Sequence, residues 1–598
     1  MGKNMSYRAP TSEILFTLRE AAGLERGLAE GLYPDLADGM AEQIFDQAIE
    51  LAHNVLDPLY RIGDQQGCRL VDGQVTTPKG WVEAYRQWQA GGWSGLTAPV
   101  EEGGMGLPHV LDVACQEVWT SANMAFMLCP LLAAGAIEAV SRHGSQELRR
   151  LYLPKMISGE WTATMNLTEP QAGSDLSALR TRAERADDGT YLIRGQKIYI
   201  TYGEHDLTDN IIHLVLARLP DAPQGTRGIS LFLVPKFLVH ADGSLGARND
   251  LRCAGLEHKM GIHGSPTCTM MYGDEAGARG WLIGEENRGL ACMFTMMNAA
   301  RLGVGLQGVA IAERASQKAL AYARERRQGR AASSDAEGMS PIIHHPDISR
   351  SIMMMKSLTA AARAICYLTA AALDRSHRGA DEKMRQLNAE RAALLTPLAK
   401  AFATDVGIDV ANMGIQVHGG MGFIEETGAA QLLRDVRIAA IYEGTNGIQA
   451  IDLVQRKLPL NGGAAMRREI ADMRLILTML ETISDEDFGA LAKRLAKAIA
   501  ALESASQWLL ATLATRPQDA LAGANAYLRL FALARGCASL TRLAIAGRNA
   551  SDPTLRAYRA LARFFGDHVA IEAPVLEDMI LSGADSLHSG ASFLMGDL

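Results

Sequence analysis

The spacing of apolar residues changes along the chain, and each change predicts a different kind of element. From residue 36 to 160, apolar side chains recur at helical spacing, as in M-A-E-Q-I-F-D-Q-A-I-E-L-A-H-N-V-L, which predicts amphipathic helices. From 161 to 285 the period shortens to that of a strand, in runs such as T-Y-L-I-R-G-Q-K-I-Y-I-T separated by turns such as D-D-G. A compact, mostly antiparallel β domain within a helical protein is the simplest account of both patterns.

Helical periodicity returns after the β domain. Residues 286–460 include long stretches such as S-I-M-M-M-K-S-L-T-A-A-A-R-A-I-C-Y-L. Pro459 and the Asn-Gly-Gly sequence at 461–463 then indicate a linker. Residues 464–598 are rich in Ala and Leu and helical in pattern, and residues 1–35 form a separate short arm before the first helical segment. The expected order is therefore arm, helical domain, β domain, second helical domain and helical tail.

The composition is that of an ordinary globular protein. A chain of 598 residues predicts three or four domains of about 150 residues each. Apolar residues make up 48% and charged residues 21%, which excludes a disordered or fibrous protein. The formal net charge of -8, without a basic stripe, argues against nucleic-acid binding. Nothing in the sequence reaches 18 consecutive apolar residues, so no transmembrane helix is predicted.

The eight cysteines are scattered, without a C-x-x-C pair. This spacing predicts neither a disulfide framework nor a metal site, and it fits a reducing cytoplasm. The chain also lacks the N-terminal apolar run of a signal peptide. A cytoplasmic location is the expectation.

One carboxylate stands at a loop-to-helix junction. Residues 438–441 are apolar and lead to Glu443, after which G-T-N-G breaks the pattern and I-Q-A-I-D-L-V-Q resumes a helix. Glu443 could be an ordinary acid of a first helical turn, with Thr445 or Asn446 as the cap. It could instead be a general base in an apolar pocket, where desolvation raises the pKa of a carboxyl group. The residues alone leave both interpretations open.

Polar segments elsewhere could serve as partners. The segment T-E-P-Q-A-G-S-D at 168–175 opens the β domain with hydroxyls and amides that can donate to an acceptor-rich ligand, although a plain capped turn has equal weight. Thr201 ends a predicted strand, which is unremarkable by itself. The H-G-G-M-G sequence at 418–422 allows close approach of a backbone to a ligand, yet glycines also end helices.

A possible dinucleotide fingerprint is best set aside. Residues 303–308 read G-V-G-L-Q-G and match G-x-G-x-x-G, but the preceding F-T-M-M-N-A-A-R-L has the pattern of a Met-rich helix. The fingerprint requires a strand before it. Small residues for tight helix packing explain these glycines better.

Five motifs occur in an order and spacing that resemble the flavin-dependent acyl-CoA dehydrogenase family. They are T-E-P-Q-A-G-S-D at 168–175, I-Y-I-T at 198–201, R-R-Q at 326–328, Q-V-H-G-G-M-G-F at 416–423 and I-Y-E-G-T-N-G-I-Q at 441–449. Each motif is weak alone, but five in order are specific, and the resemblance covers residues 36–460. The arm and the tail go beyond the common members. This long layout resembles the bacterial branch that contains 3-(methylthio)propanoyl-CoA dehydrogenases.

The resemblance implies a fold and a reaction. The fold would be α+β and mostly helical: a helical N-domain, a β-barrel middle domain and a four-helix bundle, with an extra helical C-terminal domain here. The reaction would be FAD-dependent dehydrogenation of an acyl-CoA to a trans-2-enoyl-CoA, with an electron-transferring flavoprotein as acceptor. The substrate would be 3-(methylthio)propanoyl-CoA or a short- to medium-chain acyl-CoA. An acyl-CoA oxidase and a non-catalytic binding or scaffold homologue remain as alternatives.

The resemblance also assigns roles to residues. Glu443 would remove the α-proton while a hydride leaves the β-carbon for the flavin N5; Ala300, at the position where some members place the base, cannot accept a proton. The substrate would contact Ser174, Arg301 and Gly444, although Arg301 could also be a capping or surface arginine. The FAD contacts would come from Met165, Thr168, Ser174, Tyr199, Thr201, Arg326, Gln328, Gln416, Gly419, Gly420, Thr445 and Gly447.

Two of these assignments depart from the family pattern. Arg326 and Gln328 would reach FAD across a subunit boundary, which implies a homodimer, but the common R-x-x-F-G pattern reads R-R-Q-G-R at 326–330 and lacks the phenylalanine. Gly447 stands where many short members carry glutamine, which agrees with the long branch.

Overall fold

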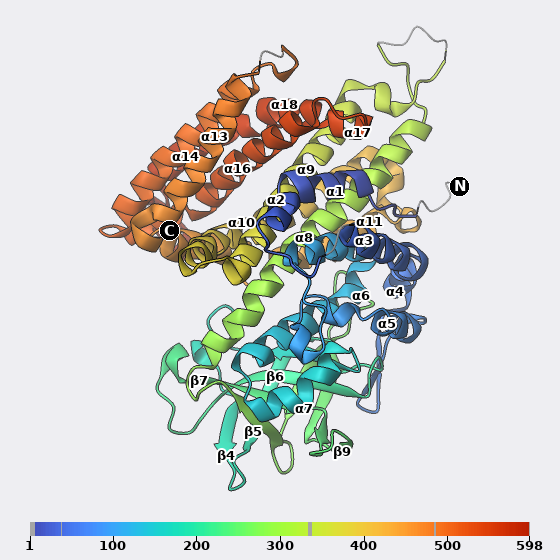
Figure 1. Ribbon diagram of the computed structural model, residues 1–598, viewed down its shortest axis with the longest axis vertical. Coiled ribbons are helices and arrows are strands. Elements are labelled where there is room, and N and C mark those ends of the chain that lie inside the picture. The colour runs from blue at the N-terminus through green and yellow to red at the C-terminus, as the bar shows by residue number, and fades with distance from the viewer. Residues whose placement is uncertain (1–5, 37–38, 333–337, 484–485, 597–598) are drawn as a thin grey trace. The chain divides into compact units, whose positions relative to one another are not determined.

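The computed structural model describes residues 6–36, 39–332, 338–483 and 486–596, and its backbone divides into two compact units (Figure 1). The barrel unit comprises residues 37–108 and 118–303. The bundle unit comprises residues 1–36, 109–117 and 304–598. Two long helices, α6 (His109–His143) and α8 (Gly289–Glu325), contribute residues to both units.

An eight-stranded sheet forms the centre of the barrel unit. β4 pairs with both β5 and β6, which closes β4, β5, β12, β7 and β6 into a ring, and β10, β11 and β3 extend it. β3 and β4 run parallel to β6, and the other pairs in this sheet are antiparallel. The prediction of a mostly antiparallel β barrel is confirmed. The strands are β3 (Trp161–Asn166), β4 (Arg182–Arg185), β5 (Tyr191–Thr201), β6 (Asn210–Arg218), β7 (Ile229–Pro235), β10 (Leu251–Leu256), β11 (Thr267–Tyr272) and β12 (Ala278–Ile283).

Both faces of β6 are buried, which explains why its sequence reads as a nearly continuous apolar run. Leu214 and Leu216 join a cluster with residues of α6 and α7 (Gln146–Ile157). Val215 and Ala217 point to the opposite face and join a cluster with residues of β5, β7 and β11. Alternating side chains of one strand therefore supply two cores. This unit also contains helices α3 (Met40–Leu51), α4 (Tyr60–Gln66) and α5 (Trp81–Ala90) and two small two-stranded sheets, β1 (Arg69–Val71) with β2 (Gln74–Thr76) and β8 (Phe237–Val239) with β9 (Leu245–Arg248).

Helices make up the bundle unit. They include the C-terminal part of α8, α9 (Pro346–Arg378), α10 (Glu382–His418), α11 (Ala429–Val436) and α12 (Asn446–Asp452). The tail adds α13 (Ala464–Glu481), α14 (Leu491–Leu513), α16 (Ala524–Gly547), α18 (Tyr558–His568) and α19 (Ala573–Leu581), of which the first four run side by side in orange and red in Figure 1. Because α16 packs on both α9 and α10, the tail shares the core of the bundle.

Two glycines of the G-x-G-x-x-G segment allow α8 to lie directly against α10. A Cβ on Gly305 would lie 2.3 Å from the Ala399 carbonyl oxygen, and one on Gly308 would lie 2.0 Å from that of Ala403. Both glycines stand in the middle of α8, so helix, and not a strand, leads directly into the motif. The interpretation of this motif as a helix-packing site is confirmed.

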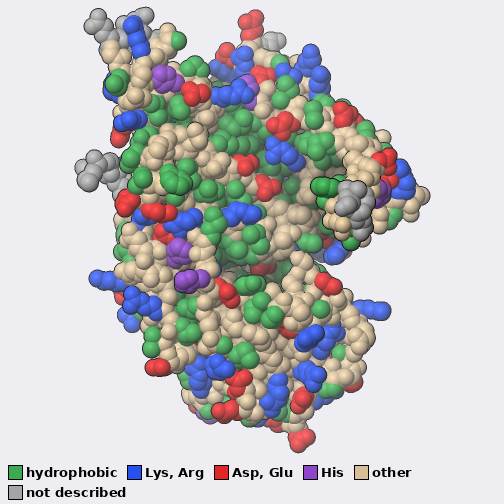
Figure 2. Space-filling view, turned by 180° about the vertical axis from the view of Figure 1, so that it is seen from behind, with side chains coloured by type: hydrophobic (Ala, Val, Ile, Leu, Met, Phe, Trp, Pro, Cys, Tyr) green, Lys and Arg blue, Asp and Glu red, His purple; other side chains and the backbone are tan. Residues whose placement is uncertain are grey.

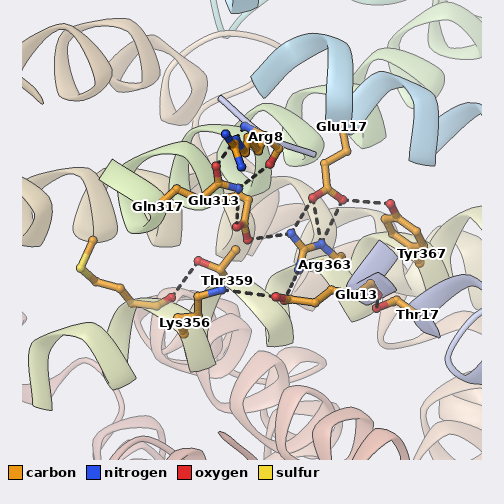
Figure 3. Close-up of polar contacts among 11 residues, drawn as sticks. Arg8, Glu13, Thr17, Glu117, Glu313, Gln317, Lys356, Thr359, Arg363 and Tyr367 are labelled. Atoms are coloured by element: carbon orange, nitrogen blue, oxygen red, sulfur yellow. Dashed lines mark hydrogen bonds and ion pairs between the residues drawn. The ribbon is translucent and has the colours of Figure 1, made fainter. Parts of the chain in front are cut away.

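The N-terminal arm packs within the bundle unit through helices α1 (Thr11–Glu20) and α2 (Leu24–Ala29). Its Glu13 belongs to a buried charge cluster around Arg363, which Figure 3 shows. The Arg363 Nη2 atom lies 2.7 Å from Glu117 Oε1 and 2.9 Å from Glu313 Oε2, and the Arg363 side chain is only 1% exposed. The pKa of Glu313 falls to about 2: burial opposes this shift, but Lys356 and Arg363 outweigh it. The arm thus supplies one of the acids that neutralise buried cations in this unit.

Three helices among the described residues, α6, α8 and α16, are long and apolar enough to cross a membrane by length and composition alone. Most of the apolar window of each is buried inside the protein. For α16, which lies wholly in the bundle unit, packing on neighbouring helices accounts for the apolar sequence. On the face shown in Figure 2, Lys and Arg side chains are interspersed with Asp and Glu side chains.

Candidate active site

The turn that carries Glu443 has an unusual backbone. Glu443 lies between α11 and α12 and adopts φ +55°, followed by Gly444 at φ +83°. A left-handed conformation at a residue other than glycine is uncommon, and it typically stores about 1–3 kcal/mol of strain. Such a conformation persists only where the surroundings impose it. Glu443 is therefore a candidate functional residue on structural grounds as well as on sequence.

Side chains of α10 and α12 hold this turn in place. Thr445 is the N-cap of α12, and its Oγ1 accepts a hydrogen bond from the Ile448 backbone N–H at 3.2 Å. The Asn446 Oδ1 atom accepts from Nζ of the buried Lys400 at 2.8 Å, which ties the turn to α10. The Gln449 side-chain amide donates to the Glu443 carbonyl at 3.2 Å. Thr445, one of the two predicted caps, is therefore the cap, whereas no motif predicted that Lys400 and Gln449 anchor the turn.

Tyr442 supports the same turn from the apolar side. Its hydroxyl donates to the Gln307 side-chain oxygen on α8. Burial raises the pKa of Tyr442 well above its ordinary value, and the negative charge of the neighbouring Glu443 raises it further. The hydroxyl therefore remains a neutral hydrogen-bond donor beside the carboxylate. The apolar run that precedes Glu443 in the sequence gave no sign of this contact.

In the barrel unit, the predicted flavin-ring residues gather where β3 and β5 end. Met165 is buried near the end of β3, and the half-buried Thr168 follows it in the loop. The Thr168 carbonyl accepts a hydrogen bond from the Ile198 N–H at 3.0 Å, which places the loop directly beside Tyr199. Ser174 is exposed farther along the same loop.

Tyr199 occupies a β-bulge. Cys268 of β11 pairs with Ile200 of β5, whereas Met270 pairs with Lys197, so that β5 contains one extra residue at this point. Tyr199 has φ +61°, and 60% of its surface is exposed. An exposed aromatic side chain on a strained bulge is typical of a ligand-binding position. Thr201 closes the strand, and its carbonyl accepts from Thr164 Oγ1 at 2.6 Å.

Arg301 lies in the N-terminal part of α8, within the barrel unit, and is 9% exposed. Because Arg301 is buried, the alternative that it is a surface arginine is wrong. Ala300 beside it is also buried, and its methyl group has no atom that could accept a proton.

The remaining predicted residues lie at helix ends of the bundle unit. Arg326 and Gln328 are exposed just after α8, where Arg326 Nη2 donates to Gln328 Oε1 at 3.4 Å. Gln416 is exposed near the end of α10. Gly419 and Gly420 follow, and a Cβ at either position would meet no atom within 4 Å. Gly444, Thr445 and Gly447 all belong to the Glu443 turn. These residues thus fall into three stretches of sequence, and stacking of Tyr322 on His418, with ring centroids 4.5 Å apart, brings the end of α8 against the end of α10.

The available groups fit FAD. The hydroxyls of Thr168, Ser174 and Thr201 are neutral donors suited to the acceptor-rich edge of a flavin ring. The guanidinium of Arg326 suits phosphate oxygens. The open space beside Gly419 and Gly420 leaves their backbone accessible to a ligand or a second chain.

Comparison with known proteins identifies the family. The models described as the acyl-CoA dehydrogenase N-terminal, middle and C-terminal domains match residues 42–160, 164–274 and 287–458. The 3-methylmercaptopropionyl-CoA dehydrogenase of Ruegeria pomeroyi is 45% identical over 98% of this chain and 99% of its own length. The chain belongs to the acyl-CoA dehydrogenase family. The tail, at 471–589, matches a model described as acetyl-CoA dehydrogenase C-terminal like.

Other relatives agree with this membership. A butyryl-CoA dehydrogenase of Syntrophomonas wolfei is 38% identical over 81% of this chain and 80% of its own. The structure of an acyl-CoA dehydrogenase complexed with FAD from Bacillus anthracis has the same fold, with a TM-score of 0.74 at 22% identity over 94% of this chain and 91% of its own. Butyryl-CoA dehydrogenase from Megasphaera elsdenii gives a TM-score of 0.56 at 25% identity over 69% of this chain and 97% of its own.

The family membership confirms several predictions from the sequence. The fold is that of an acyl-CoA dehydrogenase with an additional C-terminal domain. The protein is an FAD-dependent oxidoreductase that acts on acyl-CoA.

Proposed function

We propose that this acyl-CoA dehydrogenase oxidises 3-(methylthio)propanoyl-CoA or a similarly short acyl-CoA, with Glu443 as the catalytic base. The substrate proposal rests on the Ruegeria pomeroyi relative, whose similarity extends over 98% of this chain and 99% of its own length. The butyryl-CoA dehydrogenases of Syntrophomonas wolfei support a short acyl chain. The observation that supports Glu443 is its left-handed backbone on a turn anchored by Lys400 and Gln449.

The chemistry explains why a carboxylate is needed. A C–H bond next to a thioester carbonyl is a very weak acid, so a base must act while a donor polarises the carbonyl. Glu443 accepts the α-proton on its carboxylate, and its own backbone N–H donates to the thioester oxygen. Bound FAD supplies the acceptor for the hydride from the β-carbon. Arg301, Gly444 and Ser174 contact the substrate and orient it.

The cofactor contacts follow from the same proposal. Met165, Thr168, Ser174, Tyr199 and Thr201 bind the flavin portion. Arg326, Gln328, Gln416, Gly419, Gly420, Thr445 and Gly447 bind the remainder of the dinucleotide. The exposure of Tyr199, Arg326 and Gln416 supports these roles, because each presents its side chain to solvent.

The electron acceptor in this proposal is an electron-transferring flavoprotein, and the enzyme works as a cytoplasmic homodimer. A caffeyl-CoA reductase-Etf complex subunit of Acetobacterium woodii, 29% identical over 60% of this chain, supports the acceptor. Phe423, 87% exposed beside Gly420, supports the dimer, because a large exposed aromatic side chain commonly marks a protein interface.

Anaerobic titration of the oxidised enzyme tests the substrate. Acyl-CoAs from butanoyl to palmitoyl, together with 3-(methylthio)propanoyl-CoA, are added in turn and the flavin absorbance is recorded. We expect the fastest bleaching with 3-(methylthio)propanoyl-CoA and butanoyl-CoA. Bleaching only by palmitoyl-CoA would contradict the proposed substrate class. Rapid reoxidation of the product-bound enzyme in air would instead favour an oxidase.

A further inference from the structure

A buried ion pair adjoins the predicted flavin-ring residues of the barrel unit. Lys197 Nζ lies 2.8 Å from Glu169 Oε1, and the two side chains are 0% and 3% exposed. Lys197 precedes the Tyr199 bulge by two residues, and Glu169 follows Thr168 directly. Neither residue has a role in the proposed reaction.

The Glu169 carboxylate accepts several hydrogen bonds from the loop that follows β3. Its Oε1 accepts from the Thr181 N–H at 3.0 Å and from Thr181 Oγ1 at 2.6 Å. Its Oε2 accepts from the Arg180 N–H at 2.7 Å and from the Gln171 side-chain amide at 2.6 Å. The Glu169 carboxylate therefore accepts hydrogen bonds from both ends of the segment 171–181, which contains Ser174. It also accepts one from Lys197.

Lys197 links Glu169 and its loop to β5. Its Nζ also donates to the Leu167 carbonyl at 2.9 Å. The next residue, Ile198, donates its N–H to the Thr168 carbonyl at 3.0 Å. Three consecutive loop residues, 167–169, are thus fastened to two consecutive strand residues, 197 and 198, immediately before the bulge.

The pair is better suited to specifying a conformation than to adding stability. Burying two charges carries a desolvation penalty that their attraction largely offsets, so an apolar pair would serve stability equally well. Burial lowers the pKa of Lys197 to about 8, while the charge of Glu169 opposes this shift. An ion pair with several fixed hydrogen bonds does, however, allow only one arrangement of the loop relative to the bulge.

We propose that Lys197 and Glu169 are positioning residues that hold Thr168 and Tyr199 in the arrangement required to bind the flavin ring of FAD. This inference rests on the proposed cofactor contacts of Thr168 and Tyr199. Lys197 and Glu169 act through these two residues without touching the cofactor.

The test compares Lys197→Met with Arg194→Met. Arg194 lies on the same strand and secures a different loop, because its guanidinium donates to the carbonyls of Gly273 at 2.8 Å and Ala276 at 2.9 Å. Each variant is stripped of flavin and titrated with FAD, and the dissociation constant, the visible flavin spectrum and the thermal unfolding midpoint are measured. We expect Lys197→Met to raise the dissociation constant at least about tenfold and to shift the flavin absorption bands. Arg194→Met should keep the dissociation constant within about twofold of the wild type.

A second variant covers the outcome in which Lys197→Met does not fold, since it leaves a buried carboxylate without its cation. The double variant Lys197→Met/Glu169→Gln removes both buried charges and should fold, yet it should show the same loss of FAD affinity. Wild-type affinity and spectrum in either folded variant would overturn the positioning role. Failure of the wild-type apoprotein to take up FAD would instead refute the proposed cofactor site itself, so that the two failures are distinguishable.

Discussion

At the scale of single residues, the informative feature of this protein is where its backbone departs from ordinary geometry. Glu443 and Tyr199, both proposed site residues, adopt left-handed conformations. Neither side chain favours that conformation, and each turn is tied to a segment distant in sequence: Lys400 holds the Glu443 turn, and the loop at 167–169 is hydrogen-bonded to Lys197 and Ile198 immediately before Tyr199. Sequence motifs predicted the positions of both residues but not their conformation, since no local pattern encodes a strained φ angle imposed by tertiary contacts.

Replacement of Glu443 by Gln removes the proposed base while preserving its shape. We expect kcat to fall by about 10²–10⁴-fold, because a positioned base contributes on this order, while FAD stays bound. Steady-state kinetics and the flavin absorbance of the purified variant measure the two effects. Glu426→Gln, an exposed glutamate before α11, is the matched control and should retain wild-type kcat. Unchanged turnover in Glu443→Gln would show that another residue takes the proton.

His213 makes the stability of the barrel unit depend on pH. It lies on β6, contacts Tyr272 and Asn166, and burial lowers its pKa to about 3. The unfolded chain binds a proton below its pKa of about 6.5 while the folded state does not. The free energy of unfolding should therefore fall by about 1.4 kcal/mol per pH unit as the pH drops from 6.5 towards 3.

The matched substitutions His213→Gln and His588→Gln test this dependence through guanidinium unfolding between pH 7 and pH 4.5. His213→Gln should reduce the slope by about 1.4 kcal/mol per pH unit over that range, while the contribution of the buried His205, whose pKa burial also lowers, remains. His588, exposed on α20 (Asp585–Ser589), should leave the slope unchanged when replaced. A profile for His213→Gln as steep as that of the wild type would contradict this assignment.

At the scale of elements, close contact between helices explains sequence features that motif matching would misread. The G-x-G-x-x-G segment lies in the middle of α8, and its glycines abut backbone carbonyls of α10. Packing also explains the sequence of strand β6, which is a nearly continuous apolar run because both of its faces are buried. Periodicity predicted the kind of each element, whereas the partner of each face came from packing between distant segments.

Gly308→Ala should therefore destabilise the bundle unit. The added Cβ would lie 2.0 Å from the Ala403 carbonyl oxygen, so that α8 and α10 must separate, and overpacking of this kind costs about 1–3 kcal/mol. Gly414→Ala in α10 is the control, because its Cβ would have no neighbour closer than 3.6 Å. That change should stabilise the helix by about 0.5–1 kcal/mol. Urea unfolding measures both, and equal effects of the two substitutions would refute the packing argument.

At the scale of the whole molecule, the comparisons established the family, and the exposed residues of the bundle unit suggest how a complete enzyme is assembled. Arg326, Gln328, Gly419 and Gly420 are proposed cofactor residues that are exposed in the single chain. Phe423 beside the glycines exposes 87% of its surface. A second chain would cover such a residue, which agrees with a cofactor shared between subunits.

Phe423→Asp should disrupt the dimer. Light scattering of the wild-type protein should give a mass of twice the 64.4 kDa of one chain. The variant should have the mass of one chain and bind FAD more weakly. A buried charge without a partner at an interface is the physical reason. Val71→Asp, at an exposed apolar residue of the barrel unit, should remain dimeric. A monomeric wild-type enzyme would refute the dimer itself.

The sequence by itself determined the class of each segment, the family and the identity of the candidate base, because these depend on local periodicity and on short motifs in a fixed order. It also predicted that residues 303–308 pack between helices. The tertiary structure alone decided the left-handed turns at Glu443 and Tyr199, the burial of Lys197 against Glu169, and the anchoring of Asn446 by Lys400. Each of these depends on contacts between residues far apart in the chain, and such contacts form only when the chain has folded.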